Sequence, residues 1–193
     1  CLGISLWIYA GLSSLKPRTV LLLSASAILA SQWIDPTVPH CHPFIQSAAI
    51  ILYCPTLDKS YPVISLFTVL QWMGFMGLGY YVGKKTEGER LKNYKSPFAF
   101  LGVCLVAAFF IVRYCNGFGN YLHWTQRPFS HSFFTISKYP PGLVFYLVTL
   151  GMMFLLWSLA LHYESQLKKP IFGPVMLFGR TPLFFYVVNL YLY

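Results

Sequence analysis

The sequence predicts an all-α polytopic membrane protein, with about six transmembrane helices and one short interfacial or re-entrant segment. Its residues are 56% hydrophobic and 10% charged, and its mean hydropathy is +0.58, whereas a soluble domain carries about 25% charged residues. The apolar residues occur in long runs without two-residue alternation. Such runs form helices in a bilayer because helices satisfy their own backbone hydrogen bonds. A single transmembrane domain, residues 1–193, is the simplest account.

The predicted spans follow from the length of the apolar runs, since a spanning helix needs about 20 mostly apolar residues. The runs are residues 1–15, 19–34, 61–83, 98–114, 143–161 and 175–193. A shorter run, residues 48–54, stops at Pro55 and is predicted to be the interfacial or re-entrant segment. The first and last runs have no polar flank, so we expect the chain to be a fragment of a longer protein, truncated at both ends.

The charges in the connections predict the orientation of the helices. The basic connections are residues 16–18, 84–95 and 162–174, and they alternate with two long connections, residues 35–60 and 116–141. The positive-inside rule places the basic connections in the cytoplasm and the long ones outside or in a lumen. The net charge of +9 therefore indicates membrane orientation and a lipid-bilayer partner, and we expect no nucleic-acid partner.

Two local patterns suggest how the helices begin and pack. Gly79 and Gly83 form a small-xxx-small pair, which favours close approach of another helix. Pro140 and Pro141 have fixed φ angles and no backbone donor, so they suit the first turn of the helix predicted at 143–161. We therefore expect the preceding Lys138 to lie at the boundary between water and lipid.

Polar residues at membrane depth are costly and are candidates for function. Arg180 is predicted either to reach lipid phosphates or to anchor a phosphorylated donor. Asn189 and Gln71 lie within predicted spans, where each would form an interhelical hydrogen bond or line a reaction chamber.

The connection 116–141 combines aromatic residues with cations, among them His123, Arg127, His131 and Lys138, with Arg113 directly before it. Cations suit an acidic ligand and aromatic faces suit sugar rings, so an acidic or hydroxylated acceptor is one interpretation. The alternative is an interfacial aromatic belt with cations that reach the lipid surface.

Several chemistries are excluded or disfavoured. The His40-Cys41-His42 segment lacks a second ligand cluster at a useful spacing, so we expect no metal site. The sequence contains no serine nucleophile elbow, P-loop or GxGxxG motif. Its five acidic residues lie in predicted loops, which argues against the intramembrane carboxylate relay of a proton-driven transporter.

Two motifs together resemble a known family. Residues 137–141 read Ser-Lys-Tyr-Pro-Pro, and residues 178–186 read Phe-Gly-Arg-Thr-Pro-Leu-Phe-Phe-Tyr. With the Trp-Met-Gly triplet at 72–74, they are similar to bacterial membrane proteins related to heparan-alpha-glucosaminide N-acetyltransferase. This resemblance covers most of the chain from Tyr61 onward. It implies a membrane acyltransferase in the bacterial inner membrane, which moves an acyl (acetyl) group from cytoplasmic acyl-CoA to a sugar or amino sugar on the other side.

The resemblance also suggests roles for particular residues. Arg180 would bind the phosphates of acyl-CoA, Asn189 would line the chamber, and Lys138, Tyr139 and His123 would form the acceptor mouth. The family's catalytic His belongs to an N-terminal span with an Asp-x-x-Arg-Gly motif, which is absent here, so no catalytic residue is assigned within this chain. The position of Asn189 is often His in the family, and Asn cannot act as a general base.

Two alternative functions remain open from the sequence. A transporter or flippase of sugar or lipid intermediates would need a continuous polar path and no donor pocket on the cytoplasmic side. A non-catalytic membrane scaffold is the other alternative, since Asn189 replaces a His. A homo-oligomer is compatible with each of these functions.

Overall fold

A computed structural model gives the fold of residues 2–12, 14–33, 42–54, 56, 58–61, 63, 65, 68–125, 127–167, 169–181, 184 and 187–188. Within these residues the regular elements are helices, and the pairing of extended backbone is limited to isolated bridges. The predicted all-α fold class is thus confirmed for the part of the chain that the structure describes.

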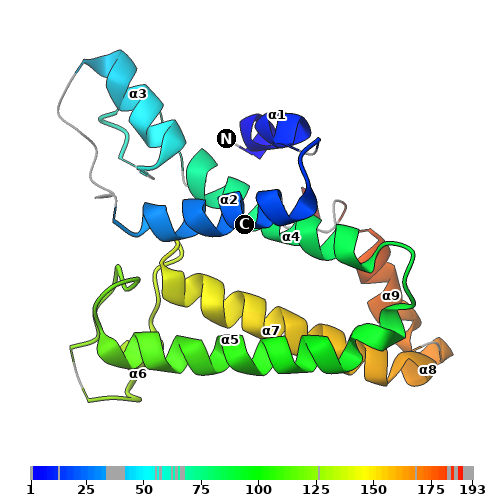
Figure 1. Ribbon diagram of the computed structural model, residues 1–193. Helices are drawn as coiled ribbons and strands as arrows, with labels where there is room; N and C mark the ends of the chain where they lie inside the picture. The colour runs from blue at the N-terminus through cyan, green and yellow to red at the C-terminus, as the bar shows by residue number, and fades with distance from the viewer. Residues whose placement is uncertain are drawn as a thin grey trace.

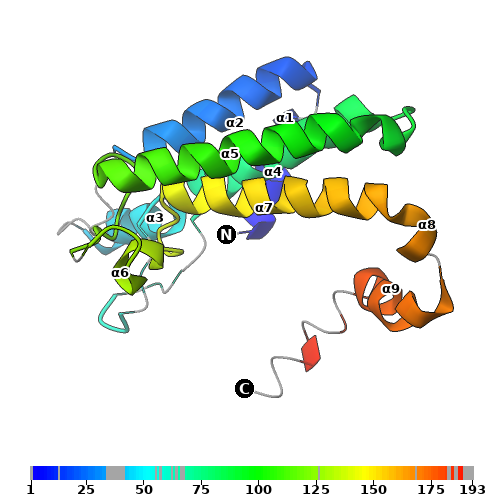
Figure 2. The same ribbon diagram turned by 90° about the horizontal axis from the view of Figure 1, so that it is seen from below.

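Four long helices form two antiparallel pairs. In one pair α2 packs along α4, and in the other α5 packs along α7 (Figure 1). Their bounds are Pro17–Ser31 for α2, Val69–Thr86 for α4, Lys95–Cys115 for α5 and Leu143–His162 for α7. The shorter α1, Leu2–Leu12, packs on α4. Figure 2 shows the two pairs lying side by side, with their axes along one direction.

The chain alternates in direction, so its connections gather at two ends of the helix pairs (Figure 1). We call one the loop end, where residues 116–142 join α5 to α7 and the short helices are α3 (Pro43–Leu52) and α6 (His131–Phe134). We call the other the basic end, where residues 87–94 join α4 to α5. Its short helices are η1 (Leu91–Tyr94), α8 (Glu164–Leu167), η2 (Pro170–Phe172) and α9 (Gly173–Arg180).

Glycines set the contact between α2 and α4. A Cβ atom on Gly74 would lie 2.6 Å from Cγ1 of Ile28, and one on Gly77 would overlap the Ser24 side chain. Gly79 and Gly83, predicted from their spacing to make such a contact, have nothing within 4 Å of a built Cβ. The close approach therefore uses Gly74 and Gly77, which lie on a different face of α4, the one that meets α2.

The α5–α7 pair is built in the same way. A Cβ on Gly102 would lie 2.7 Å from Cγ of Leu155, and one on Gly151 would lie 2.8 Å from Cγ2 of Val106. Paired small residues let two helix backbones come together where lipid tails supply little driving force for association. Ser158 then donates a hydrogen bond to the Lys95 carbonyl at 2.7 Å, which joins the two helices near the basic end.

The predicted count of about six spans is not confirmed. Among the residues that the structure describes, two helices, Leu91–Cys115 and Leu143–His162, are long and apolar enough to cross a membrane. The span predicted at 61–83 begins as helix only at Val69, because Thr56 and Ser65 pair as an antiparallel bridge before it. In the last predicted span α9 ends at Arg180, and most of the residues beyond it lie outside the described part of the chain.

The short apolar segment is a helix that begins earlier than predicted. The expected segment was 48–54, whereas α3 starts at Pro43. Pro suits the first turn of a helix, and Nδ1 of His42 accepts a hydrogen bond from the Phe44 N–H at 3.3 Å. This cap explains why the ten-residue helix begins before the apolar run does.

Replacing Gly77 by Leu should destabilise the protein, because the new side chain would collide with Ser24 on α2. Overpacking of this kind costs about 1–3 kcal/mol. We expect a lower thermal midpoint for the purified protein in detergent. The matched variant Gly79→Leu has open space around it, and should keep the midpoint or raise it. Equal losses in both variants would contradict the α2–α4 contact described above.

Candidate functional site

The loop end is organised around the side chain of Arg113. This residue lies in the last turn of α5 and is fully buried, with 0% of its surface exposed. Its five N–H groups make five hydrogen bonds of 2.6–2.9 Å, so its donor capacity is filled. The acceptors are the side chain of Asn120 and the backbone carbonyls of Leu122, Ser132, Phe133 and Thr135.

Further contacts enclose this guanidinium in what we call the Arg113 cluster, namely Arg113, Asn116, Asn120, Trp124 and Phe133. The Phe133 ring, which is itself buried, lies 5.8 Å from the guanidinium carbon. Nε1 of Trp124 donates to the Arg113 carbonyl at 2.8 Å. Asn116 adopts a left-handed conformation, with φ of 50°, and exchanges two hydrogen bonds with the Trp124 backbone. Because a buried charge is costly unless it is hydrogen-bonded, the loop must fold closely around Arg113.

Polar contacts at this end join the loop and α7 to the α2–α4 pair. The Tyr121 hydroxyl donates to the Ser31 carbonyl of α2 at 2.8 Å. Oε1 of Gln32 accepts a hydrogen bond from the Leu143 N–H at 2.8 Å, which satisfies one of the free donors at the start of α7. The Tyr146 hydroxyl donates to the Gln71 carbonyl of α4 at 3.2 Å. These three contacts all lie at or near the loop end.

Gln71 contacts another helix through its backbone carbonyl, whereas the interhelical hydrogen bond was predicted for its side chain, which bonds at the start of its own helix. It is 2% exposed, and its side chain forms a hydrogen bond with the Thr68 hydroxyl. Its carbonyl accepts the bond from Tyr146 described above, so it joins α4 to α7. Asn189, the other polar residue predicted within a span, lies outside the described residues.

Lys138 and Tyr139 lie together at the loop end. Nζ of Lys138 is 5.1 Å from the centroid of the Tyr139 ring, and the lysine side chain is exposed. The two prolines do not enter α7 as predicted, because Lys138 and Pro141 pair as a bridge and the helix begins only at Leu143. The Ser137 hydroxyl donates to the Pro140 carbonyl at 2.9 Å within this turn. The motif thus forms a rigid turn before the helix.

The surface of the loop end carries cations and aromatic rings. The connection 116–142 contains no Asp or Glu, and its His123, Arg127 and Lys138 side chains are exposed. Phe129 is 63% exposed and has a φ of 64°, a conformation that L-residues rarely adopt. Such a surface can bind an anionic or hydroxylated ligand, and it equally suits the interfacial aromatic belt considered above.

The described part of the loop end contains one carboxylate outside this connection, that of Asp58. The Ser60 N–H donates to its Oδ1 at 2.9 Å. The hydrogen bonds from the backbone and side chain of Ser60 lower the pKa of this exposed carboxyl. The carboxylate is therefore held in its ionised form.

Arg180 lies at the opposite end of the molecule, at the end of α9 (Figure 1). Its exposed side chain borders a hollow of about 360 Å³. Lys169 borders the same hollow, so two cations lie beside apolar side chains. The remaining lining residues are Leu167, Pro170, Gly173, Met176 and Leu177. The predicted site residues that the structure describes therefore form two groups, one at each end, and do not share one cavity.

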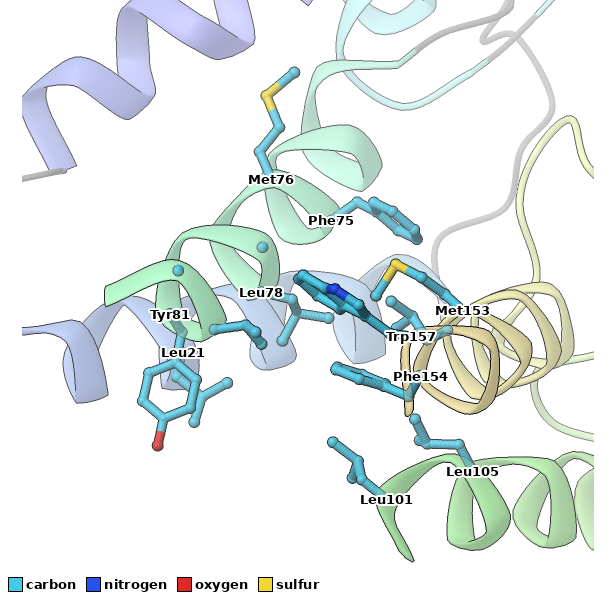
Figure 3. Close-up of a pocket in the computed structure, with 14 residues that line it drawn as sticks. Leu21, Phe75, Met76, Leu78, Tyr81, Leu101, Leu105, Met153, Phe154 and Trp157 are labelled. Carbon is cyan, nitrogen blue, oxygen red and sulfur yellow. The ribbon is translucent and has the colours of Figure 1, made fainter. Parts of the chain in front are cut away.

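An apolar groove of about 630 Å³ lies between the two helix pairs. Figure 3 shows Trp157 and Phe154 extending from α7 into the space between α4 and α5. Leu101 and Leu105 of α5 lie beside them in the same view. A sugar would find few hydrogen-bonding groups here, whereas a hydrocarbon chain fits this lining.

Sequence reasoning did not identify the role of Arg113, which it grouped with the exposed cations of the loop. The available signal was a lone Arg near the end of a long apolar helix, followed by the turn-forming residues Asn-Gly-Phe-Gly-Asn at 116–120. A cation in that setting is either at the interface or buried by the loop that follows it. Hydrophobic pattern alone does not separate these two outcomes.

The profile of the family described as OpgC protein matches residues 4–193. The chain belongs to the OpgC protein family. OpgC proteins are membrane proteins of an acyltransferase family involved in glucan modification. The coarse prediction of a membrane acyltransferase family is thereby confirmed, whereas the match does not extend to the heparan-alpha-glucosaminide N-acetyltransferase relation. No curated protein and no solved structure matches the chain.

Replacing Arg113 in this OpgC-family protein should loosen the loop end. In Arg113→Gln the five acceptors lose most of their donors, and each hydrogen bond to a charged group contributes about 1.5–3 kcal/mol. We expect faster amide hydrogen exchange across residues 116–142, with little change at 84–95. Arg113→Lys should not restore protection, because lysine has three donors where five are used.

The matched control is Arg127→Lys, an exposed position on the same connection. It should leave exchange in the loop unchanged. Unchanged exchange in Arg113→Gln as well would show that the loop is ordered by other contacts.

Proposed function

We propose that this OpgC-family chain is part of a membrane acyltransferase that uses acyl-CoA as donor and a glycan or amino sugar as acceptor. Family membership supports the acyltransferase chemistry. The observation that carries the finer proposal is that the Lys138 turn and Arg180 lie at opposite ends of the helix pairs (Figure 1). Donor and acceptor would thus approach from opposite faces of the membrane, with the basic end in the cytoplasm of a bacterial cell.

The donor would bind at the basic end. Coenzyme A carries several phosphates, and Arg binds phosphate through charge-assisted, often bidentate hydrogen bonds. Arg180 and Lys169 border one hollow, and both side chains are exposed and therefore accessible to a ligand. The apolar residues in the same hollow, such as Met176 and Leu177, would contact the adenine or pantetheine portions.

The acceptor would bind at the loop end. Lys138 and Tyr139 form an adjacent cation and ring, and an aromatic face with a nearby donor suits a sugar hydroxyl and its ring. His123 is exposed on the same connection and would add a further polar contact. The Arg113 cluster holds the chain next to this surface, since Arg113 donates a hydrogen bond to the carbonyl of Thr135, just before the Lys138 turn.

The chemistry requires a general base, which this proposal places outside the chain. A His in another part of the protein would take the proton of the acceptor hydroxyl or amine. The acceptor oxygen or nitrogen would form a bond to the thioester carbonyl carbon. The carbon–sulfur bond would break, and coenzyme A would leave as a thiol after protonation. Asn189 would line the chamber in this scheme, without a proton-transfer role.

The groove between the helix pairs favours this proposal over a sugar transporter. A transporter needs a continuous polar path, whereas the groove is lined by apolar residues such as Phe75, Leu105 and Phe154. The hollow with Arg180 at the basic end would be the donor pocket, which the acyltransferase hypothesis needs and the transporter hypothesis does not.

Steady-state kinetics of the full-length protein test the assignment of the two ends. Arg180→Ala should raise the KM for acyl-CoA about tenfold, since losing one charge-assisted contact costs about 1.4 kcal/mol or more, while the acceptor KM stays the same. Lys138→Ala should raise the KM for the glycan acceptor and leave that for the donor unchanged.

Arg90→Ala and Lys59→Ala are the controls, since both residues are exposed, one at the basic end and one at the loop end. Neither should change either KM. The assignment is wrong if Arg180→Ala and Lys138→Ala affect the same substrate, or if neither has an effect. Movement of a labelled glycan across the membrane without acyl transfer would support the transporter instead.

A further inference from the structure

The apolar groove lies between the helix pairs, mainly toward the basic end. Most of its lining residues, such as Gly79, Leu101 and Trp157, lie in the halves of their helices nearest that end. The hydrogen bonds that join the pairs, such as Tyr146 to Gln71 and Leu143 to Gln32, lie toward the loop end. The two pairs are therefore held together at one end and leave an apolar opening toward the other.

Glycine residues keep this groove open. Gly79 and Gly83 both line it, and a Cβ built on either meets nothing within 4 Å. Larger side chains at these positions would enter the groove. Gly79 and Gly83 thus leave space beside α4. The contact between α2 and α4 is made at Gly74 and Gly77 instead.

The volume fits a small hydrophobic ligand better than another helix. The groove measures about 630 Å³, and ligand pockets typically measure about 300–1,000 Å³. A helix is about 10 Å across and rises 1.5 Å per residue. The groove would therefore hold only about five residues of a helix.

Cations without a carboxylate partner lie at the mouth of the groove. Lys85 follows the lining residue Gly83 on α4, and its Nζ is 5.9 Å from the ring centroid of Tyr81, which also lines the groove. Arg18 lies one turn before the lining residue Leu21 on α2, on the same face of the helix. Among the described residues neither cation has a carboxylate within 4.0 Å.

Neighbouring lysines differ from these two. Lys84 pairs with Glu87 at 2.8 Å, and Lys92 pairs with Glu164 at 3.4 Å. Arg18 and Lys85 are thus two cations beside the groove that can neutralise an incoming anion. An apolar groove with a cationic mouth is complementary to a molecule with a hydrocarbon tail and an anionic head.

We propose that this groove binds one acyl chain of an anionic phospholipid, with the headgroup phosphate at Arg18 and Lys85. The bilayer supplies such lipids directly, and each basic residue near the surface strengthens their binding about fivefold. A lipid without net charge would enter the same groove but would bind more weakly, because Arg18 and Lys85 would contribute less to its affinity. This binding goes beyond the proposed acyl transfer, because it requires neither donor nor acceptor.

Fluorescence quenching in vesicles tests the proposal. The full chain is reconstituted in phosphatidylcholine vesicles that contain a small fraction of brominated phosphatidylglycerol or brominated phosphatidylcholine. The Trp157 signal is obtained by subtracting the emission of Trp157→Phe. We expect half-maximal quenching of Trp157 at a five- to tenfold lower fraction of the brominated anionic lipid.

Two sets of variants separate the mouth from the groove. Arg18→Gln with Lys85→Gln should remove the preference for the anionic lipid, whereas Lys59→Gln at the loop end should keep it. Gly79→Leu fills the groove and should weaken quenching by both lipids. Gly11→Leu, another helical glycine with open space around it, should not. Circular dichroism of each variant checks that helicity is retained.

Equal quenching of Trp157 by the two brominated lipids in the unmodified protein would overturn the proposal, because the groove would then hold bulk bilayer lipid only. Absence of quenching by either lipid would also overturn it. The groove would then be covered by another segment of the protein or by a second copy.

Discussion

The end of α5 places the charged guanidinium of Arg113 among buried aromatic rings. The loop end folds so that every N–H group of this guanidinium has a hydrogen-bond acceptor. Its five hydrogen bonds reach acceptors between Asn120 and Thr135. No carboxylate takes part, so the charge is balanced by carbonyl dipoles and one amide oxygen. Two segments of the connection, residues 120–122 and 132–135, therefore contact the arginine side chain. The Lys138 turn begins shortly after the second segment.

The helix pairs impose a second constraint, which acts through small residues. Gly74 and Gly77 bring α4 onto α2, while Gly102 and Gly151 bring α5 onto α7. Each pair is closely packed, yet the polar contacts between the pairs lie at or near the loop end. Because the polar contacts lie at one end, the apolar groove remains between the pairs toward the basic end, near the cations of the basic connections.

Hydrophobic pattern predicted most of the helices but not all of their bounds. The runs at 98–114 and 143–161 became α5 and α7 almost unchanged, because a long apolar segment has few alternatives to a helix. The run at 61–83 was too long, since Thr56 and Ser65 pair as an antiparallel bridge and the helix begins only at Val69. The glycine contact was placed on the wrong face of α4, at Gly79 and Gly83, because residue spacing does not reveal which face of a helix meets its neighbour.

The parts of the candidate site that rest on sequence motifs were predictable, and the parts that rest on backbone groups were not. Short motifs pointed to the Lys138 turn and to Arg180, and the structure shows them at opposite ends (Figure 1). The role of Arg113 depends on backbone carbonyls from residues far along the chain. Such acceptors carry no signature in the sequence, because every residue has a carbonyl. The role of Gln32 at the start of α7 was hidden in the same way.

The central claim, that the two motifs face opposite sides of a membrane, can be measured directly by thiol labelling. Single cysteines are introduced by Lys138→Cys or Arg180→Cys in a cysteine-free background, and sealed right-side-out vesicles are treated with a membrane-impermeant maleimide. The account predicts labelling at position 138 in sealed vesicles, and at position 180 only after the membrane is permeabilised. Labelling of both positions from the same side would contradict it.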